Sequence, residues 1–239
     1  YEDYARGENL THRMPLWITP AEKVGIEDMF SLMRDHFEGT SLDMTKDVGA
    51  GPFACPYRWR PMTWSYEGKD YIHERATSTQ QTGFSFIAQC RGRFPDPVGG
   101  IIWFGVDDTY STCYVPIFCG VTQVPHCFKV GNGDMMTYSP TAAFWLFNQV
   151  ANFAYSRYSD MIKDIQGVQS ELEENFVRLV KEKSGELADQ YKANPQKGIE
   201  ALNKFSGNQA NIMFNRWKSL SQYLLVKYMD GNIKKEKNG

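Results

Sequence analysis

The fold of this 239-residue chain depends first on one apolar run that ends in two carboxylates: Gly100-Ile101-Ile102-Trp103-Phe104-Gly105-Val106-Asp107-Asp108. Its β-branched and aromatic residues, bounded by glycine and aspartate, are typical of a β-strand. Comparable runs on both sides predict strands at residues 70–75, 77–91 and 112–120. Their spacing predicts an antiparallel meander.

Helices are predicted on either side of these strands. Thr19 as N-cap, Pro20 at the first helical position and Glu22 at N3 predict a helix start, and Gly39 predicts its end. Ser139-Pro140 is predicted to cap a long helical segment with apolar residues at helical spacing. Asn194-Pro195 starts a second helix, and an apolar stripe marks a third: Met213, Trp217, Leu220, Leu224 and Tyr228.

Composition changes near residue 138. The part before it holds 14 of the 20 glycines, 9 of the 11 prolines, all five cysteines and a net charge of −5. The part after it carries a net charge of +3. We therefore expect a strand-rich portion at 1–138, with one N-terminal helix, and a helical region at 139–239.

Composition also excludes several classes of function. The formal charge of −2 and the pI of about 6.1 argue against a nucleic-acid or anionic-membrane binder. No apolar run reaches the roughly 20 residues that a membrane span needs. Motifs such as GxGxxG, GxxxxGK[ST], HExxH, CxxC and GxSxG are missing, so we expect no organic cofactor. The spacing of Cys113, Cys119, His126 and Cys127 fits no standard zinc site, so we expect no metal.

Two stretches are candidates for chemistry. Residues 74–86 are polar on both strand faces in their first half, which indicates either a site rich in hydrogen-bond partners or an edge strand with Thr/Gln ladders. Asp107 and Asp108 form a carboxylate pair that could hold a ligand ammonium or share a proton. Paired aspartates are also ordinary in turns, and spacing alone favours the turn.

At these same segments the sequence resembles the cysteine dipeptidases of the dipeptidase A and secernin type, which are N-terminal-nucleophile (Ntn) hydrolases. The matching runs cover nearly the whole chain: residues 15–18, 33–40, 43–45, 49–53, 56–61, 74–86, 103–110, Cys113-Tyr114 and 143–145, continuing into the long helices.

The resemblance implies an α+β fold, part of a four-layer αββα sandwich of antiparallel strands, followed by the long C-terminal helices. It also implies hydrolysis of dipeptides by an N-terminal cysteine whose own α-amine is the base. The chain begins with Tyr1, so we expect that nucleophile outside it and assign the role to none of the five cysteines. The chain would then be the C-terminal portion of a dipeptidase and inactive alone.

Further expectations follow from the resemblance. The partners would be a dipeptide, the missing N-terminal half and further copies of the protein, and an apolar sheet face or strand edges would be left uncovered. The compartment, cytoplasmic or exported to the periplasm, would depend on the residues before Tyr1.

Within the cleft, Arg75 would pair with the substrate carboxylate. Asp107 or Asp108 would hold its ammonium, and Thr79 and Gln81 would support catalysis. Two other functions remain open: a catalytically silent peptide-binding or subunit-interaction module, and an independent cysteine hydrolase that uses Cys55 or Cys119.

Overall fold

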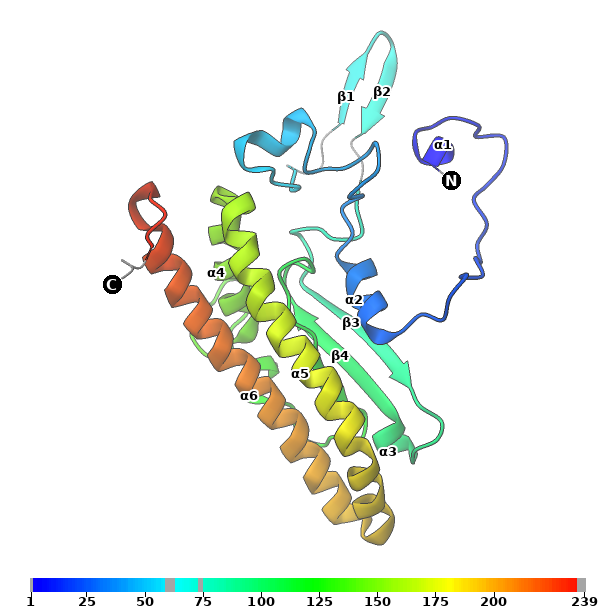
Figure 1. The fold of residues 1–239 in the computed structure, drawn as a ribbon, viewed down its shortest axis with the longest axis vertical. Coiled ribbons are helices and arrows are strands. Elements are labelled where there is room, and N and C mark those ends of the chain that lie inside the picture. The colour runs from blue at the N-terminus through cyan, green and yellow to red at the C-terminus, as the bar shows by residue number, and fades with distance from the viewer. Residues whose placement is uncertain (1, 59–62, 73–74, 236–239) are drawn as a thin grey trace.

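The computed structural model describes residues 2–58, 63–72 and 75–235 (Figure 1). The chain is α+β, with antiparallel strands followed by long C-terminal helices, as the sequence predicts. The strands are β1 (Thr63–Tyr66), β2 (Lys69–Ile72), β3 (Phe84–Cys90), β4 (Gly100–Val106) and β5 (Val115–Phe118). The α-helices are α1 (Glu2–Ala5), α2 (Ile26–Met33), α3 (Asp96–Gly99), α4 (Ala143–Ser156), α5 (Tyr158–Ala193) and α6 (Pro195–Tyr228). Three 3₁₀ turns are η1 (Val48–Phe53), η2 (His126–Phe128) and η3 (Met229–Gly231).

Strands β3, β4 and β5 form the predicted antiparallel meander, in that order. The register pairs Ile87 with Trp103 and Ile101 with Phe118, and all four side chains are buried. Because side chains alternate across a strand, these residues define one inner face of the sheet. This face and helices α4, α5 and α6 contribute to a single apolar core.

The long helices pack as an antiparallel hairpin with α4 beside it (Figure 1). Inside the bundle, Phe147 of α4 stacks on Trp217 of α6 with ring centroids 4.3 Å apart. Glu173 of α5 is buried, pairs with Arg34 at 2.6 Å and accepts a 2.8 Å hydrogen bond from the Tyr114 backbone. A buried carboxylate satisfied in this way connects α5 to the segments around α2 and β5.

The sequence predicts one helix start correctly and two wrongly. Asn194 caps α6, since its side chain accepts a bond from Lys197 N, and Pro195 is the first helical residue. In contrast, α2 begins at Ile26, where the Gly25 N–H donates to the Asp28 carboxylate, rather than at Thr19-Pro20. Ser139 does not cap α4, because the helix begins at Ala143 with Ala142 in the N-cap position, and the Ser139 hydroxyl donates instead to Asn132 Oδ1 at 2.6 Å.

Helix and strand lengths also differ from the prediction. The helical pattern after residue 139 is interrupted at Arg157, between α4 and α5, while the predicted second and third C-terminal helices are one helix, α6. Of the strand predicted at 77–91 only Phe84–Cys90 forms, and that predicted at 112–120 is Val115–Phe118. The strand predicted at 70–75 is β2, paired with β1, which the sequence analysis missed; residues 73 and 74 lie outside the described residues.

The outer face of the meander is apolar and exposed, in agreement with the expected uncovered sheet face. Phe84 is 62% exposed, Phe86 52% and Ile102 37%. Every strand lies before residue 138 and α4, α5 and α6 lie after it, but both parts share the core, so the division into two parts stays a prediction. No helix in the described ranges is long and apolar enough to cross a bilayer.

Two glycines of α6 give a matched test of the helical hairpin. A Cβ on Gly198 would overlap the Tyr191 backbone and lie 2.7 Å from Tyr191 Cβ, whereas one on Gly207 would meet nothing within 4 Å. We expect Gly198→Ala to lower the unfolding free energy by about 1–3 kcal/mol through overpacking. Gly207→Ala should raise it by up to about 1 kcal/mol, because alanine favours the helix.

Thermal unfolding measures both changes, because each kcal/mol shifts the melting temperature of a domain of this size by about 2–4 °C. Equal melting temperatures for the two variants would show that the close approach of α5 and α6 at Gly198 is wrong.

Candidate functional site

The end of β4 turns sharply and carries both predicted carboxylates inward. Asp107 has a positive φ of 66° and its N–H donates to Gly83 O at 2.9 Å. Aspartate is among the few residues that adopt this left-handed conformation at low cost. The turn leaves Asp107 only 2% exposed and Asp108 only 1% exposed.

Asp108 is held by hydrogen bonds from three parts of the chain. The Tyr57 hydroxyl donates to Asp108 Oδ2, and the Ser111 hydroxyl donates to the same oxygen at 3.3 Å. Asp108 Oδ1 accepts from Tyr110 N at 3.1 Å and from the Ser78 hydroxyl at 3.4 Å. Burial raises the pKa of Asp108, and the bond from Tyr57 opposes that rise.

Aromatic rings surround Tyr57, which donates to this carboxylate. The Tyr57 ring lies 4.6 Å from Tyr155, 5.8 Å from Tyr158 and 5.5 Å from His36. Burial, followed by the negative charge of Asp108, raises the pKa of Tyr57, so the hydroxyl stays a donor at neutral pH. We call Tyr57, Ser78, Asp107, Asp108 and Ser111 the carboxylate cluster.

Asp107 differs from its neighbour in having an unused oxygen. Its Oδ1 accepts a 2.9 Å bond from the Asn148 side chain on α4, while its buried Oδ2 has no hydrogen-bond partner among the residues described. Burial raises the pKa of Asp107 to about 7, and the charge of Asp108 adds to the rise. Asp107 Oδ2 is therefore the atom of the cluster that can accept a further hydrogen bond.

A protein-family model matches most of this chain. The model for peptidase family C69 matches residues 1–171, which include the whole carboxylate cluster. The chain belongs to peptidase family C69. A search of curated proteins finds similarity to a probable dipeptidase B of Lactococcus lactis subsp. lactis (strain IL1403), 23% identical over 175 residues. The match covers 68% of this chain and 32% of that protein, so the C69 chain spans about a third of the length of this relative.

The C69 chain brings only some of the predicted site residues together. Asp107 and Asp108 are adjacent in the cluster. Thr79 and Gln81 are hydrogen-bonded to each other at 2.6 Å, one residue beyond Ser78, but make no bond to either aspartate. Arg75 is exposed on an irregular segment and has no hydrogen bond or ion pair within the part of the chain that is described.

Sequence reasoning missed three members of the carboxylate cluster, Tyr57, Ser78 and Ser111, and the neighbouring His36. His36 is fully buried, its ring centroid lies 4.6 Å from that of Tyr110, and its Nδ1 is 3.6 Å from Glu38 Oε1. Neither ring nitrogen has a hydrogen-bond partner among the described residues. Tyr57 and Ser78 lie inside the runs that resemble the family, and this could have pointed to them. Their contacts with Asp108 could not be predicted, because they lie 51 and 30 residues from it in the sequence.

The five cysteines are free thiols. Burial raises the pKa of Cys55 and of Cys119, the two cysteines considered as nucleophiles, and it raises those of Cys113 and Cys127 further. A raised pKa keeps a thiol protonated and weakly nucleophilic at neutral pH. In the described ranges, no group of three or more His, Cys, Asp or Glu side chains could hold a metal ion.

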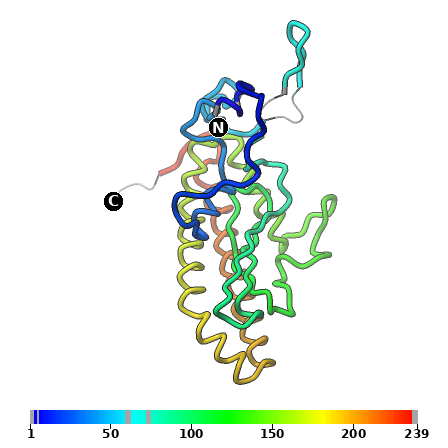
Figure 2. Tube along the Cα trace, turned by 90° about the vertical axis from the view of Figure 1, so that its right-hand side faces the viewer, coloured from blue at the N-terminus to red at the C-terminus, as the bar shows by residue number. Residues whose placement is uncertain are grey.

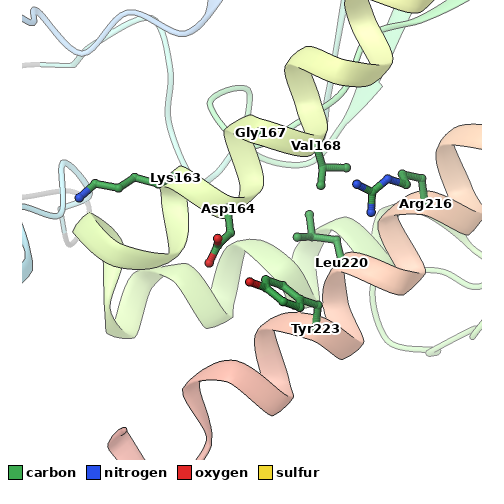
Figure 3. Close-up of a pocket in the computed structure, with 7 residues that line it drawn as sticks. All are labelled: Lys163, Asp164, Gly167, Val168, Arg216, Leu220 and Tyr223. Atoms are coloured by element: carbon green, nitrogen blue, oxygen red, sulfur yellow. The ribbon is translucent and has the colours of Figure 1, made fainter. Parts of the chain in front are cut away.

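A pocket on the outer side of the helical hairpin, about 340 Å³ in volume, is separate from this site (Figure 3). It lies between α5 and α6 and includes Asp164 and Arg216. Asp164 already pairs with Lys227 at 2.8 Å, and Arg216 pairs with Glu171 at 2.7 Å. These ion pairs account for two of the charges around the pocket and are ordinary contacts between helices.

Removal of the Tyr57 hydroxyl tests the carboxylate cluster. Tyr57→Phe deletes a donor to a buried carboxylate, and we expect the unfolding free energy at pH 7 to fall by about 1–3 kcal/mol. Tyr155→Phe is the matched control, because the Tyr155 ring packs on Tyr57 but its hydroxyl makes no hydrogen bond with described residues. Denaturant unfolding measures both, and an equal effect of the two variants would contradict the assignment.

The raised pKa of Asp107 gives a pH-dependent prediction. With a pKa of about 7 when folded against 3.8 for the ordinary side chain, Asp107 binds its proton more tightly in the folded state. Its stabilising contribution is present at low pH and is lost as the pH rises through 7. Asp107→Asn removes the ionisation and can keep the bond from Asn148.

We therefore expect Asp107→Asn to raise the melting temperature relative to wild type by several degrees more at pH 8 than at pH 5. Asp189→Asn, at a position whose side chain is 81% exposed, should follow the wild type at both pH values. A constant difference between Asp107→Asn and wild type from pH 5 to pH 8 would exclude this titration.

Proposed function

We propose that this chain is the C-terminal portion of a cysteine dipeptidase whose nucleophile, an N-terminal cysteine, lies outside these 239 residues. Membership of peptidase family C69, over residues 1–171, is the observation that carries the proposal. The printed name of the relative, probable dipeptidase B, supports dipeptides as substrates. Its greater length supports a further part of the protein that would hold the nucleophile.

The exposed sheet face also supports this division. In an αββα sandwich, two sheets pack face to face about 10 Å apart and each is covered outside by helices. The β3–β4–β5 sheet has helices against its inner face and an uncovered apolar outer face that includes Phe84 and Phe86. A second sheet from the N-terminal half would bury the part of this face around Phe86 and complete the sandwich.

The proposed reaction is acyl transfer to the cysteine followed by hydrolysis. The α-amine of the cysteine takes the thiol proton, sulfur bonds to the peptide carbonyl carbon, and the C–N bond breaks as the proton passes to the leaving amine. Water then attacks the thioester, the S–C bond breaks, and the thiol is restored. This sequence of steps involves neither a metal nor an organic cofactor.

Residues of this chain would bind and orient the substrate. Arg75, which is exposed and has no hydrogen-bond or ion-pair partner among the described residues, would pair bidentately with the dipeptide carboxylate. Asp107 Oδ2, the buried oxygen without a bond, would accept from the substrate ammonium, and Asp108 would position the turn that carries it. Thr79 and Gln81 stay candidate supporting residues on the segment that Ser78 attaches to the cluster.

Hydrolysis of dipeptides by the complete protein tests the proposal. The correctly processed full-length protein should cleave dipeptides, whereas the 239-residue chain alone should not. A peptide chloromethyl ketone should label the N-terminal cysteine of the full-length protein and no cysteine of the isolated chain. Stoichiometric labelling of Cys55 or Cys119 in the isolated chain would favour an independent cysteine hydrolase. A full-length protein without dipeptidase activity would favour a silent binding module.

Substitutions in the full-length protein test the site residues. We expect Arg75→Ala to lower kcat/KM for dipeptides roughly 100-fold, mainly through a higher KM, because a charge-assisted bidentate contact is lost. Asp108→Asn should lower kcat/KM at least tenfold by disturbing the turn. Arg178→Ala removes an exposed arginine from a helical ion pair and should have no effect. Unchanged kinetics for both site variants would show that these assignments are wrong.

A further inference from the structure

An aromatic groove of about 500 Å³ lies on the exposed side of the sheet. Five rings line it, from β3, β4, η2 and the start of α4: Phe84, Phe104, Phe128, Phe144 and Trp145. The ring centroids of Phe84 and Phe104 are 6.0 Å apart, and those of Phe104 and Phe128 are 5.1 Å apart. A volume of this size, with mostly apolar walls, is typical of a small-molecule site.

One wall of the groove is the segment of residues 127–135. It projects beside the sheet in Figure 2, in green. Gly131 and Gly133 both have positive φ and form an isolated bridge, which turns the chain back on itself. The Trp145 indole donates to Thr137 O at 3.1 Å and ties the far end of this turn to α4.

The turn brings two opposite charges to the same groove. Lys129 and Asp134 both line it, both are exposed, and neither has an ion-pair partner in the described part of the chain. Asp134 accepts a 2.8 Å bond from Met136 N, and this bond lowers the pKa of its carboxyl, so it is ionised at neutral pH. An apolar floor with one cation and one anion at its edge matches an apolar ligand that carries both charges.

The groove adjoins the carboxylate cluster. Val106 and Gly83 line one end of it, and Asp107 follows Val106 directly in the chain. The Asp107 N–H donates to Gly83 O at 2.9 Å, so the same pair of segments forms the end of the groove and the turn of the cluster.

We propose that this groove binds the large apolar side chain of a zwitterionic dipeptide, with Lys129 paired to its carboxylate and Asp134 to its ammonium. The inference rests on the proposed function and adds a substrate preference to it. The chain should bind Leu-Leu more tightly than Gly-Gly, because Phe84 and the neighbouring rings contact the leucine side chain. Each additional buried methylene of the ligand contributes about 0.8 kcal/mol, so a leucine side chain should improve binding well over tenfold. Neither Arg75 nor Asp107 lines the groove. Lys129 and Asp134 therefore bind the dipeptide at a position separate from the reacting one, where Arg75 would hold the carboxylate and Asp107 Oδ2 the ammonium.

Calorimetric titration of the 239-residue chain with Leu-Leu and Gly-Gly tests the inference without requiring catalysis. We expect Leu-Leu to bind at least tenfold more tightly than Gly-Gly. Phe84→Ser should weaken the binding of Leu-Leu about tenfold. The matched control is Phe86→Ser, since Phe86 is exposed on the same face of β3 but does not line the groove. It should change the affinity less than twofold.

Two further variants test the ionic contacts of Lys129 and Asp134. Lys129→Gln should weaken Leu-Leu but not Leu-Leu amide, which lacks the carboxylate. Asp134→Asn should weaken Leu-Leu but not N-acetyl-Leu-Leu, which lacks the ammonium. Lys218→Gln, at an exposed position of α6, should change neither affinity.

Several outcomes would overturn the inference. These are equal affinity for Leu-Leu and Gly-Gly, equal effects of Phe84→Ser and Phe86→Ser, or no binding at 10 mM ligand, about tenfold above a Kd of 1 mM. Light scattering on the same variants can give a further overturning outcome. If Phe84→Ser dissociates a dimer and leaves the affinity for Leu-Leu unchanged, the groove is an interface between copies of the chain. If Leu-Leu binds as expected but the full-length protein hydrolyses no dipeptide, only the proposed function fails.

Discussion

The structure depends on one costly constraint, the burial of two adjacent carboxylates at the end of β4. A buried ionised group is tolerated only when hydrogen bonds or opposite charges replace its water. Asp108 obtains two of these bonds locally, from Tyr110 and Ser111, and two from Tyr57 and Ser78, which lie 51 and 30 residues away in the sequence. The requirement therefore fixes the irregular segments around Tyr57 and Ser78 against the sheet, although neither is part of a strand.

The second constraint is that the sheet has helices against only one face. The inner face contributes to a core with α4, α5 and α6, and Glu173 and Arg34 add a buried ion pair that crosses between α5 and α2. The outer face keeps aromatic rings in contact with solvent at Phe84 and Phe86. Such a face marks a place where another surface or ligand belongs. The second sheet proposed for the complete enzyme and the dipeptide proposed for the groove would occupy different parts of it.

Much of the regular structure could be predicted from local sequence. The apolar run of β4, the apolar spacing of α5 and the Asn194-Pro195 start of α6 are local patterns, and the structure contains all three. Thr19-Pro20 failed as a helix start because capping residues contribute only about 1 kcal/mol, and α2 forms where Phe30 packs between Trp103 and Tyr114. The interruption at Arg157 has no proline or glycine to predict it.

The sequence by itself determined the α+β class, the antiparallel meander, the long C-terminal helices and the family to which the chain belongs. It also singled out Asp107 and Asp108 as a pair, because two adjacent carboxylates follow the apolar strand directly, although such pairs are also ordinary in turns. Only the tertiary structure shows that both oxygens of Asp108 accept hydrogen bonds, whereas Asp107 Oδ2 accepts none from the described residues. Only it placed Lys129 and Asp134 at the edge of an aromatic groove. The reason is physical: these properties depend on contacts between residues 30 to 50 positions apart, or on a turn that reverses the chain, and local pattern carries no information about either.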